Sequence, residues 1–268
     1  MMGLIFDSHS AKRYESWYLS AKGEAFHGFI ERHIPSLLNP HAGDKVLDIG
    51  CGSGKHLQYL STLGIDITGV DASPYMINQA RERLGDRCSL KTGMAEDLPF
   101  EDNEFDIAIF INTLEFLDDP LPALREAGRV TRRRVFIGII NSLSWYRFYD
   151  KILRLFHHSP LQNMKSYNLW ELKTYIMTAF GQVPITWKSM QVFPHFFTRM
   201  GGFSSNLSQQ THCPFGPFLG LSLKIAYTIK TDNLPLKLRV NKAGRTVASG
   251  ITPIGTVNQN PSSSQAKS

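Results

Sequence analysis

The sequence predicts an α/β fold, in which a mostly parallel sheet of seven strands carries helices on both faces. Short apolar runs alternate with longer amphipathic stretches, and this alternation is typical of such a sheet. The chain has 268 residues with 42% hydrophobic content, enough to bury a full-sized core. One apolar run also ends in a glycine-rich turn, VLDIGCGSGKH, at 46–56. Together these features favour one large domain.

The apolar runs predict strands at seven places and the amphipathic stretches predict helices at six. The strands are expected at 45–50, 66–71, 89–92, 105–112, 135–141, 185–192 and 219–228. The helices are expected near 15–37, 55–63, 74–84, 120–129, 143–156 and 169–179. Ser73 before Pro74 fits a helix start, and Gly64 and Gly85 lie where helices should end. Parallel order is not assumed for the last strand, which follows the loop-like PFGP.

The net charge of +6 lies mainly at the C-terminal end. From 230 to 268 there are six basic residues and one acid, which leaves about +1 on the other 229 residues. A basic patch on the folded body is therefore not indicated, and no nucleic-acid partner is expected. We expect 231–268 to be a solvated basic extension, disordered from about 254, with contact to an acidic partner as the alternative.

The cysteines and the N-terminal residues favour a reducing cytoplasm. The three cysteines, Cys51, Cys88 and Cys213, are odd in number and widely spaced, which suggests neither a disulfide framework nor a zinc cluster. The first residues do not read as an export signal, and no run of about 18 apolar residues predicts a membrane span. No metal site is expected, and the sequence does not predict an oligomeric state.

The glycine-rich turn and a downstream acid together predict a nucleoside ligand. The turn follows the first buried strand, at the edge where an open α/β sheet binds ligands. Asp71 ends the next apolar run, 21 residues after Gly50, where a carboxylate can accept both hydroxyls of a ribose. A dinucleotide fingerprint would need glycine at 55, which is Lys55. A tight turn without a ligand is the alternative.

At this point the sequence resembles the class I S-adenosylmethionine-dependent methyltransferases, in the small-molecule branch that includes the ubiquinone and menaquinone methyltransferases. The resemblance is carried by VLDIGCGSG, GVDAS, GMAEDLPFEDNEFDIAIF and LEFLDDPLPALREAGRV, and it covers roughly 14–181. It implies a Rossmann-like fold, S-adenosylmethionine as cofactor and a small-molecule methyl acceptor. It also implies a domain at 41–230, with a substrate-specific insertion around 142–218, and an N-terminal helical lid at 1–40.

The resemblance assigns cofactor contacts residue by residue. Asp48 and the loop Gly50, Cys51, Gly52 and Gly54 would hold the amino-acid end, and Asp71 the ribose. Ala72, Met76, Ala95 and Glu96 would lie near the adenine, and Asn112 beside the sulfonium. Tyr14 and Trp17, in a segment similar to the Y-D-x-W helix of these enzymes, would cover the cofactor. Met94 stands where many relatives carry Asp, which leaves the adenine amino group to backbone amides, Glu96 or Asp97.

The chemistry itself requires no universal catalytic residue, because a sulfonium methyl is already activated. Candidates for a base or a substrate contact are Glu115, Tyr146, Tyr149 and His195, each of which could instead be structural. Two other functions stay open: a non-catalytic S-adenosylmethionine-binding protein, and a nucleic-acid or protein methyltransferase. Against the latter, INTLEF stands where an N-P-P-Y-type tetrapeptide would be.

Overall fold

The computed structural model describes residues 5–144, 164–190, 210–225, 238–240 and 246–248. Two compact units are separated, Met1–Tyr227 and Thr228–Ser268. In the second unit, β9 (Leu238–Val240) and β10 (Thr246–Ala248) pair as a small antiparallel ribbon. The expected disorder from about 254 and the predicted helix beyond 144 lie outside the described residues.

The first unit is built on one mixed sheet with the strand order β3-β2-β1-β4-β5-β8-β6-β7. Strands β1 to β5 are parallel, whereas β8 runs antiparallel to its neighbours β5 and β6. The predicted strands and the mostly parallel core are confirmed, and a two-residue β7 adds an eighth strand. The strands are β1 Lys45–Ile49, β2 Asp66–Asp71, β3 Ser89–Thr92, β4 Phe105–Ile111, β5 Thr131–Ile140, β6 Ile185–Met190, β7 Gln210–Thr211 and β8 Phe218–Lys224.

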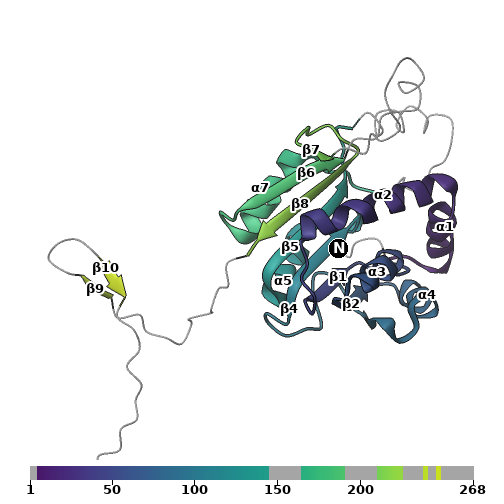
Figure 1. The fold of residues 1–268 in the computed structure, drawn as a ribbon, viewed down its shortest axis with the longest axis horizontal. Helices are drawn as coiled ribbons and strands as arrows, with labels where there is room; N and C mark the ends of the chain where they lie inside the picture. The colour runs from purple at the N-terminus through teal and green to yellow at the C-terminus, as the bar shows by residue number, and fades with distance from the viewer. Residues whose placement is uncertain (1–4, 145–163, 191–209, 226–237, 241–245, 249–268) are drawn as a thin grey trace, which may run out of the picture. The chain divides into compact units, whose positions relative to one another are not determined.

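Helices cover both faces of this sheet (Figure 1). One face carries α2 (Ala21–Leu38), α3 (Lys55–Leu60) and α4 (Pro74–Leu84), and the other carries α5 (Pro120–Val130) and α7 (Leu169–Phe180). Three short 3₁₀ turns follow at Ser61–Leu63, Gly85–Arg87 and Leu114–Phe116. None of the described helices is long and apolar enough to cross a membrane.

The single helix expected over 15–37 is two helices, α1 (Ser8–Tyr18) and α2. Ser20 causes the break, because its extended backbone and its side chain, which accepts the amide of Gly23 at 3.2 Å, make it the N-cap of α2. The amphipathic pattern continues across the break and therefore did not reveal it. As a result, α1 can take a direction of its own relative to the sheet.

Strands β4 and β5 form the centre of the core and are buried on both faces. Phe110 packs with Leu124 and Leu172 on the α5 and α7 side, and Phe136 packs with Ile34 on the α2 side. All five side chains are fully buried. Burial on both faces explains why FDIAIF reads as a continuous apolar run rather than an alternating one.

The three arginines at 132–134 lie on β5, which begins at Thr131 and not at 135 as predicted. The Nε atom of Arg132 donates to Asp106 at 2.8 Å, Arg133 pairs with Asp44, and Arg134 donates to the carbonyl of Leu38 at 2.6 Å. Because these bonds join β5 to β4 and to the end of α2, they brace the amino-terminal edge of the sheet.

Two glycine substitutions test the packing of the core. A Cβ atom on Gly138 of β5 would lie 2.5 Å from the ring of Phe218, which is fully buried. We expect Gly138→Ala to lower the free energy of unfolding by about 1–3 kcal/mol, because the ring must move. Gly28→Ala on α2, where a Cβ meets nothing within 4 Å, should raise it by about 0.5–1 kcal/mol. Urea unfolding measures both, and unchanged stability of Gly138→Ala would contradict the packing.

Candidate functional site

A pocket opens at the carboxyl ends of β1, β2, β3 and β4. It lies where the strand order reverses, since the chain runs outward from β1 to β3 and then continues on the other side of β1 with β4. Its empty volume is about 720 Å³, which includes space open to solvent. Its lining residues are Ile5, Phe6, Tyr14, Ile49, Gly50, Gly52, Val70, Asp71, Ala72, Met76, Gly93, Met94, Ala95, Glu96, Ile111, Asn112, Thr113, Phe116 and Leu117.

Gly50 is required by the close approach of β1 and β4. Its φ of +75° is in the left-handed region, and its amide donates to the carbonyl of Val70 at 2.8 Å. A Cβ atom here would lie 2.2 Å from Cγ2 of Thr113. Thr113 cannot easily move away, because its hydroxyl donates to the carbonyl of Ile49 at 2.8 Å. Gly50 therefore joins two strand ends and also lines the pocket.

Gly52 presents bare backbone at the rim of the pocket. Its φ is +55°, and a Cβ atom there would meet nothing within 4 Å, so the space next to it is open. Its amide donates to Oδ2 of Asp71 at 2.9 Å, which fixes the loop against the end of β2. A ligand can thus approach the main chain at this position. Gly54 lies farther along the loop and is the N-cap of α3.

Asp71 is the acid at the centre of the pocket. Oδ2 accepts the amide of Gly52, and Oδ1 accepts the amide of Ser73 at 2.8 Å. Burial raises the pKa of Asp71, whereas these two hydrogen bonds lower it. A carboxylate has about four lone-pair positions, so two directions remain for hydroxyl groups of a ligand. This geometry fits the predicted ribose contact.

Asp48 and Cys51, two further predicted contacts, lie in the interior and do not line the pocket. The carboxyl of Asp48 on β1 is 1% exposed. Burial, followed by the charge of Asp71, raises the pKa of Asp48 to about 8. The thiol of Cys51 is buried among the apolar side chains on the α3 side, and this burial raises its pKa well above the usual range.

The residues predicted near the adenine and the sulfonium all line the pocket: Ala72, Met76, Ala95, Glu96 and Asn112. Among the described residues, Oε2 of Glu96 and Oδ1 of Asn112 are buried without a hydrogen-bond partner. Asn112 has a φ of +54°, and its backbone N–H donates to the carbonyl of Gly138 at 2.9 Å. Buried polar atoms of this kind normally have partners, so a polar ligand in the pocket fits both.

The N-terminal segment contributes an aromatic wall that sequence reasoning predicted only in part. Tyr14 lines the pocket as expected, and it packs with Phe6 and Phe116 at ring distances of 5.2 and 6.2 Å. Burial raises the pKa of Tyr14 well above its usual range, so its hydroxyl stays protonated near neutral pH. Trp17 lies on α1, and its side chain is outside the described part. No sequence motif predicted a role for Phe6 in the pocket, because it is a single aromatic residue before α1.

An ion pair fastens α1 to the glycine loop. Glu15 on α1 accepts the hydroxyl of Ser53 at 2.7 Å and pairs with Arg83 on α4. Arg83 also donates to the carbonyl of Ser53. A second tie joins the hydroxyl of Ser73 to the carbonyl of Phe6 at 2.6 Å. We call the cluster of Glu15, Ser53 and Arg83 the latch.

The structure describes only one of the four candidate bases. Glu115 is only 1% exposed, and its Oε1 accepts the backbone amide of Ile140 at 2.8 Å. It is not among the residues that line the pocket. This bond joins the turn after β4 to the end of β5. Tyr146, Tyr149 and His195 lie outside the described residues.

The raised pKa of Asp48 predicts a pH-dependent stability. Between about pH 4 and pH 8 the unfolded chain has released this proton and the folded chain has kept it, so stability falls as pH rises. The slope is at most about 1.4 kcal/mol per pH unit for one proton. Asp48→Asn should therefore become more stable relative to the wild type as pH rises through this window. Urea unfolding at several pH values measures this difference. Asp66→Asn, at the exposed start of β2, is the control. If the free energy of unfolding changes with pH in the same way for Asp48→Asn and the wild type, the raised pKa is contradicted.

Comparison with known proteins identifies the central segment of the chain. Residues 47–138 match a family described as a methyltransferase domain. Among curated proteins, the chain is 37% identical over 109 residues to the O-methyltransferase resE of Aspergillus sclerotiorum, covering 38% of this chain and 41% of that protein. The chain spans between 41% and 62% of the length of this relative and two further ones.

Solved structures share the fold over most of the chain. A Thermotoga maritima protein, described as an S-adenosylmethionine-dependent methyltransferase and possible histamine N-methyltransferase, has a TM-score of 0.60 at 23% identity, covering 80% of this chain and 94% of that one. The magnesium protoporphyrin IX methyltransferase of Synechocystis, solved with bound S-adenosylhomocysteine, has a TM-score of 0.60 at 15% identity, covering 82% and 96%. Residues 47–138 thus match a methyltransferase domain, within a chain that has the Rossmann-like fold found in S-adenosylmethionine-dependent methyltransferases.

Proposed function

We propose that this protein binds S-adenosylmethionine in the pocket and transfers its methyl group to a small molecule. The observation that carries the proposal is the position of Asp71. Its carboxylate lines a pocket at the reversal of strand order, and two backbone amides hold it with lone pairs left over. That is the chemistry a ribose needs, and the matched methyltransferase domain includes this residue.

The remaining lining fits the other parts of this cofactor. The open backbone at Gly52 accommodates the amino-acid end, and the apolar side chains of Met76 and Ala95 accommodate the faces of the adenine. The buried oxygens of Glu96 and Asn112 can accept hydrogen bonds from ligand N–H groups. When bound, S-adenosylmethionine supplies a methyl group on a positively charged sulfur, already activated for in-line displacement.

The aromatic wall supports a small apolar or aromatic acceptor. Phe6, Tyr14 and Phe116 bring ring surfaces to the pocket, and such a wall excludes water while a nucleophile is oriented. The Tyr14 hydroxyl keeps its proton and donates it in a hydrogen bond to the hydroxyl of Tyr18 at 3.1 Å, so it does not serve as a base. The acceptor then brings an anionic or weakly acidic nucleophile, or a residue outside the described part removes its proton.

Cofactor binding should depend on Asp71. Asp71→Asn replaces one acceptor oxygen with an NH₂ group, which cannot accept a hydrogen bond from the amide of Gly52, the amide of Ser73 or a ribose hydroxyl. Loss of a hydrogen bond to a charged group costs about 1.5–3 kcal/mol. Calorimetry should therefore show S-adenosylmethionine binding at least about tenfold more weakly. The control is Asp66→Asn, at the opposite end of the same strand. Equal affinity of Asp71→Asn and the wild type would contradict the ribose assignment.

The same proteins test methyl transfer. Wild type and Asp66→Asn, incubated with methyl-labelled cofactor and a pool of cell metabolites, should place label on a small molecule, and Asp71→Asn should do so much more slowly. Label on protein or nucleic acid alone would contradict the proposed acceptor class. Cofactor binding without any labelled product would favour a non-catalytic binding protein.

The latch should control how fast the cofactor leaves. Arg83→Met removes the partner of Glu15, so α1 can lift from the glycine loop, and dissociation should become about three- to tenfold faster, the effect of losing a partly buried ion pair of about 1 kcal/mol. Arg81→Met, on the same helix but exposed, is the matched control and should leave the rate unchanged. Stopped-flow fluorescence measures both rates. Equal rates would show that α1 does not gate the pocket.

A further inference from the structure

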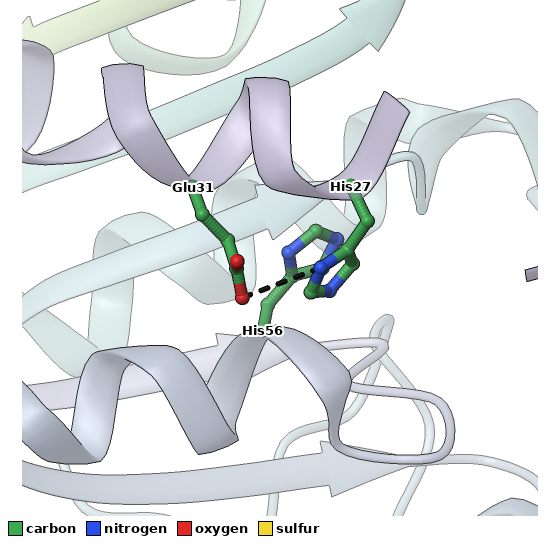
Figure 2. Close-up of side chains that lie close together, drawn as sticks. All are labelled: His27, Glu31 and His56. Atoms are coloured by element: carbon green, nitrogen blue, oxygen red, sulfur yellow. Dashed lines mark ion pairs between the residues drawn. The ribbon is translucent and has the colours of Figure 1, made fainter. Parts of the chain in front are cut away.

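A second cluster of potential ligands lies outside the pocket, between α2 and α3. His27 and Glu31, one helical turn apart on α2, face His56 in the first turn of α3 (Figure 2). Each residue offers one ligand atom, and these atoms all lie within 4.8 Å of one another. Nδ1 of His27 is 3.3 Å from Oε1 of Glu31. None of the three residues lines the pocket described above.

The two imidazoles are buried without the partners that such groups normally have. Their rings stack at a centroid distance of 4.3 Å with an interplanar angle of 15°. His56 is only 8% exposed, and in the described part of the chain neither of its nitrogens has a hydrogen-bond partner. The same holds for Nε2 of His27. Leaving three buried ring nitrogens without partners is costly, which points to a ligand for them.

A metal ion binds the lone pair of a neutral imidazole nitrogen. The side chains of His27 and Glu31 are 12% and 21% exposed, so the cluster is not fully closed to solvent. The charges of Lys55 and Arg83 act on His27 and oppose a cation, whereas Glu15 and Glu31 favour one.

We propose that His27, Glu31 and His56 bind a divalent transition-metal ion of the Zn²⁺ type. Two imidazole nitrogens and one carboxylate oxygen are a donor set that suits Zn²⁺ and not Mg²⁺ or Ca²⁺, which prefer oxygen ligands. With metal–ligand bonds of about 2.0–2.2 Å, tetrahedral ligand atoms lie roughly 3.3–3.6 Å apart, so separations of up to 4.8 Å must shrink by up to about 1.5 Å. Because the lone pairs of the two stacked rings lie in nearly parallel planes, one imidazole must also rotate toward the ion. A water completes the coordination.

The position of the site suggests what the ion does. His56 is the second residue of α3, directly after the glycine loop that ends at Gly54. His27 and Glu31 lie on α2, which follows the helix that carries Tyr14 and Glu15. A bound ion therefore cross-links α2 to the start of α3, at the end of the glycine loop. This inference does not rest on the proposed methyl transfer, because metal binding is measured without cofactor or acceptor.

Calorimetric titration of the chelator-treated full chain with Zn²⁺ tests the site. We expect one equivalent to bind, and His56→Gln, His27→Gln and Glu31→Gln each to weaken binding by about tenfold or more. His41→Gln is the matched control, because His41 is an exposed histidine away from the cluster, and it should bind as the wild type does. Mg²⁺ should give no heat of binding. Equal Zn²⁺ affinity in the wild type and the three ligand variants would overturn the proposal.

Two further measurements keep the result interpretable if a histidine variant folds poorly. Glu31→Gln changes a partly exposed group, so its circular dichroism spectrum should match that of the wild type while its Zn²⁺ affinity falls. Zn²⁺ should also raise the melting temperature of the wild type and of His41→Gln but not that of Glu31→Gln. Equal stabilisation of all three by Zn²⁺ would place the metal elsewhere and contradict the site.

Discussion

The paired hydrogen bonds of the Asp71 carboxylate hold the centre of the site together. One oxygen binds the amide of Gly52, in the loop after β1, and the other binds the amide of Ser73, at the start of α4. The loop, the end of β2 and the helix are thereby fixed to one side chain. Because Gly52 is held from one side only, its opposite side stays open to the pocket.

The attachment of Phe6 and α1 over the pocket also depends on the position of Asp71. Ser73, whose amide binds Asp71, uses its hydroxyl to hold the carbonyl of Phe6. Ser53, one residue after Gly52, is held by Glu15 of α1 and by Arg83 of α4. The N-terminal segment is thus fastened to the two structures that Asp71 positions. A ligand that displaces Asp71 or the glycine loop therefore also displaces α1, because these hydrogen bonds join them. In this way the proposed cofactor binding is coupled to the position of the aromatic wall.

Much of the fold and of the cofactor pocket could be predicted from the sequence, because the signals were local. Apolar runs predicted β1 to β5, and the spacing of Gly50, Gly52 and Asp71 predicted the pocket. Three features depended on contacts that no local pattern carries. Ser20 splits the N-terminal helix although the amphipathic pattern continues. Phe6 is held at the pocket by its bond to Ser73 and by its ring contacts with Tyr14 and Phe116. His27 and Glu31 meet His56 only because α2 packs beside α3.

Buried acids were the other difficulty for sequence reasoning. Glu115 lies in the turn after β4 near lining residues, so its position suggested a base; the structure instead has its carboxylate holding the backbone of β5. Asp48 belongs to the same glycine motif as Gly50, yet it is buried, with a raised pKa, and is not among the residues that line the pocket. A sequence pattern shows that an acid lies at the end of a strand. It does not show whether the side chain of that acid faces the pocket or the interior of the protein.

A crystal structure of the full chain with S-adenosylhomocysteine would show directly whether Asp71 binds the ribose. We expect the ribose hydroxyls to lie about 2.6–3.0 Å from the Asp71 carboxylate, with the amino-acid end over Gly52 and the adenine between Met76 and Ala95. A nucleoside bound elsewhere, or one in the pocket with its ribose out of reach of Asp71, would contradict it.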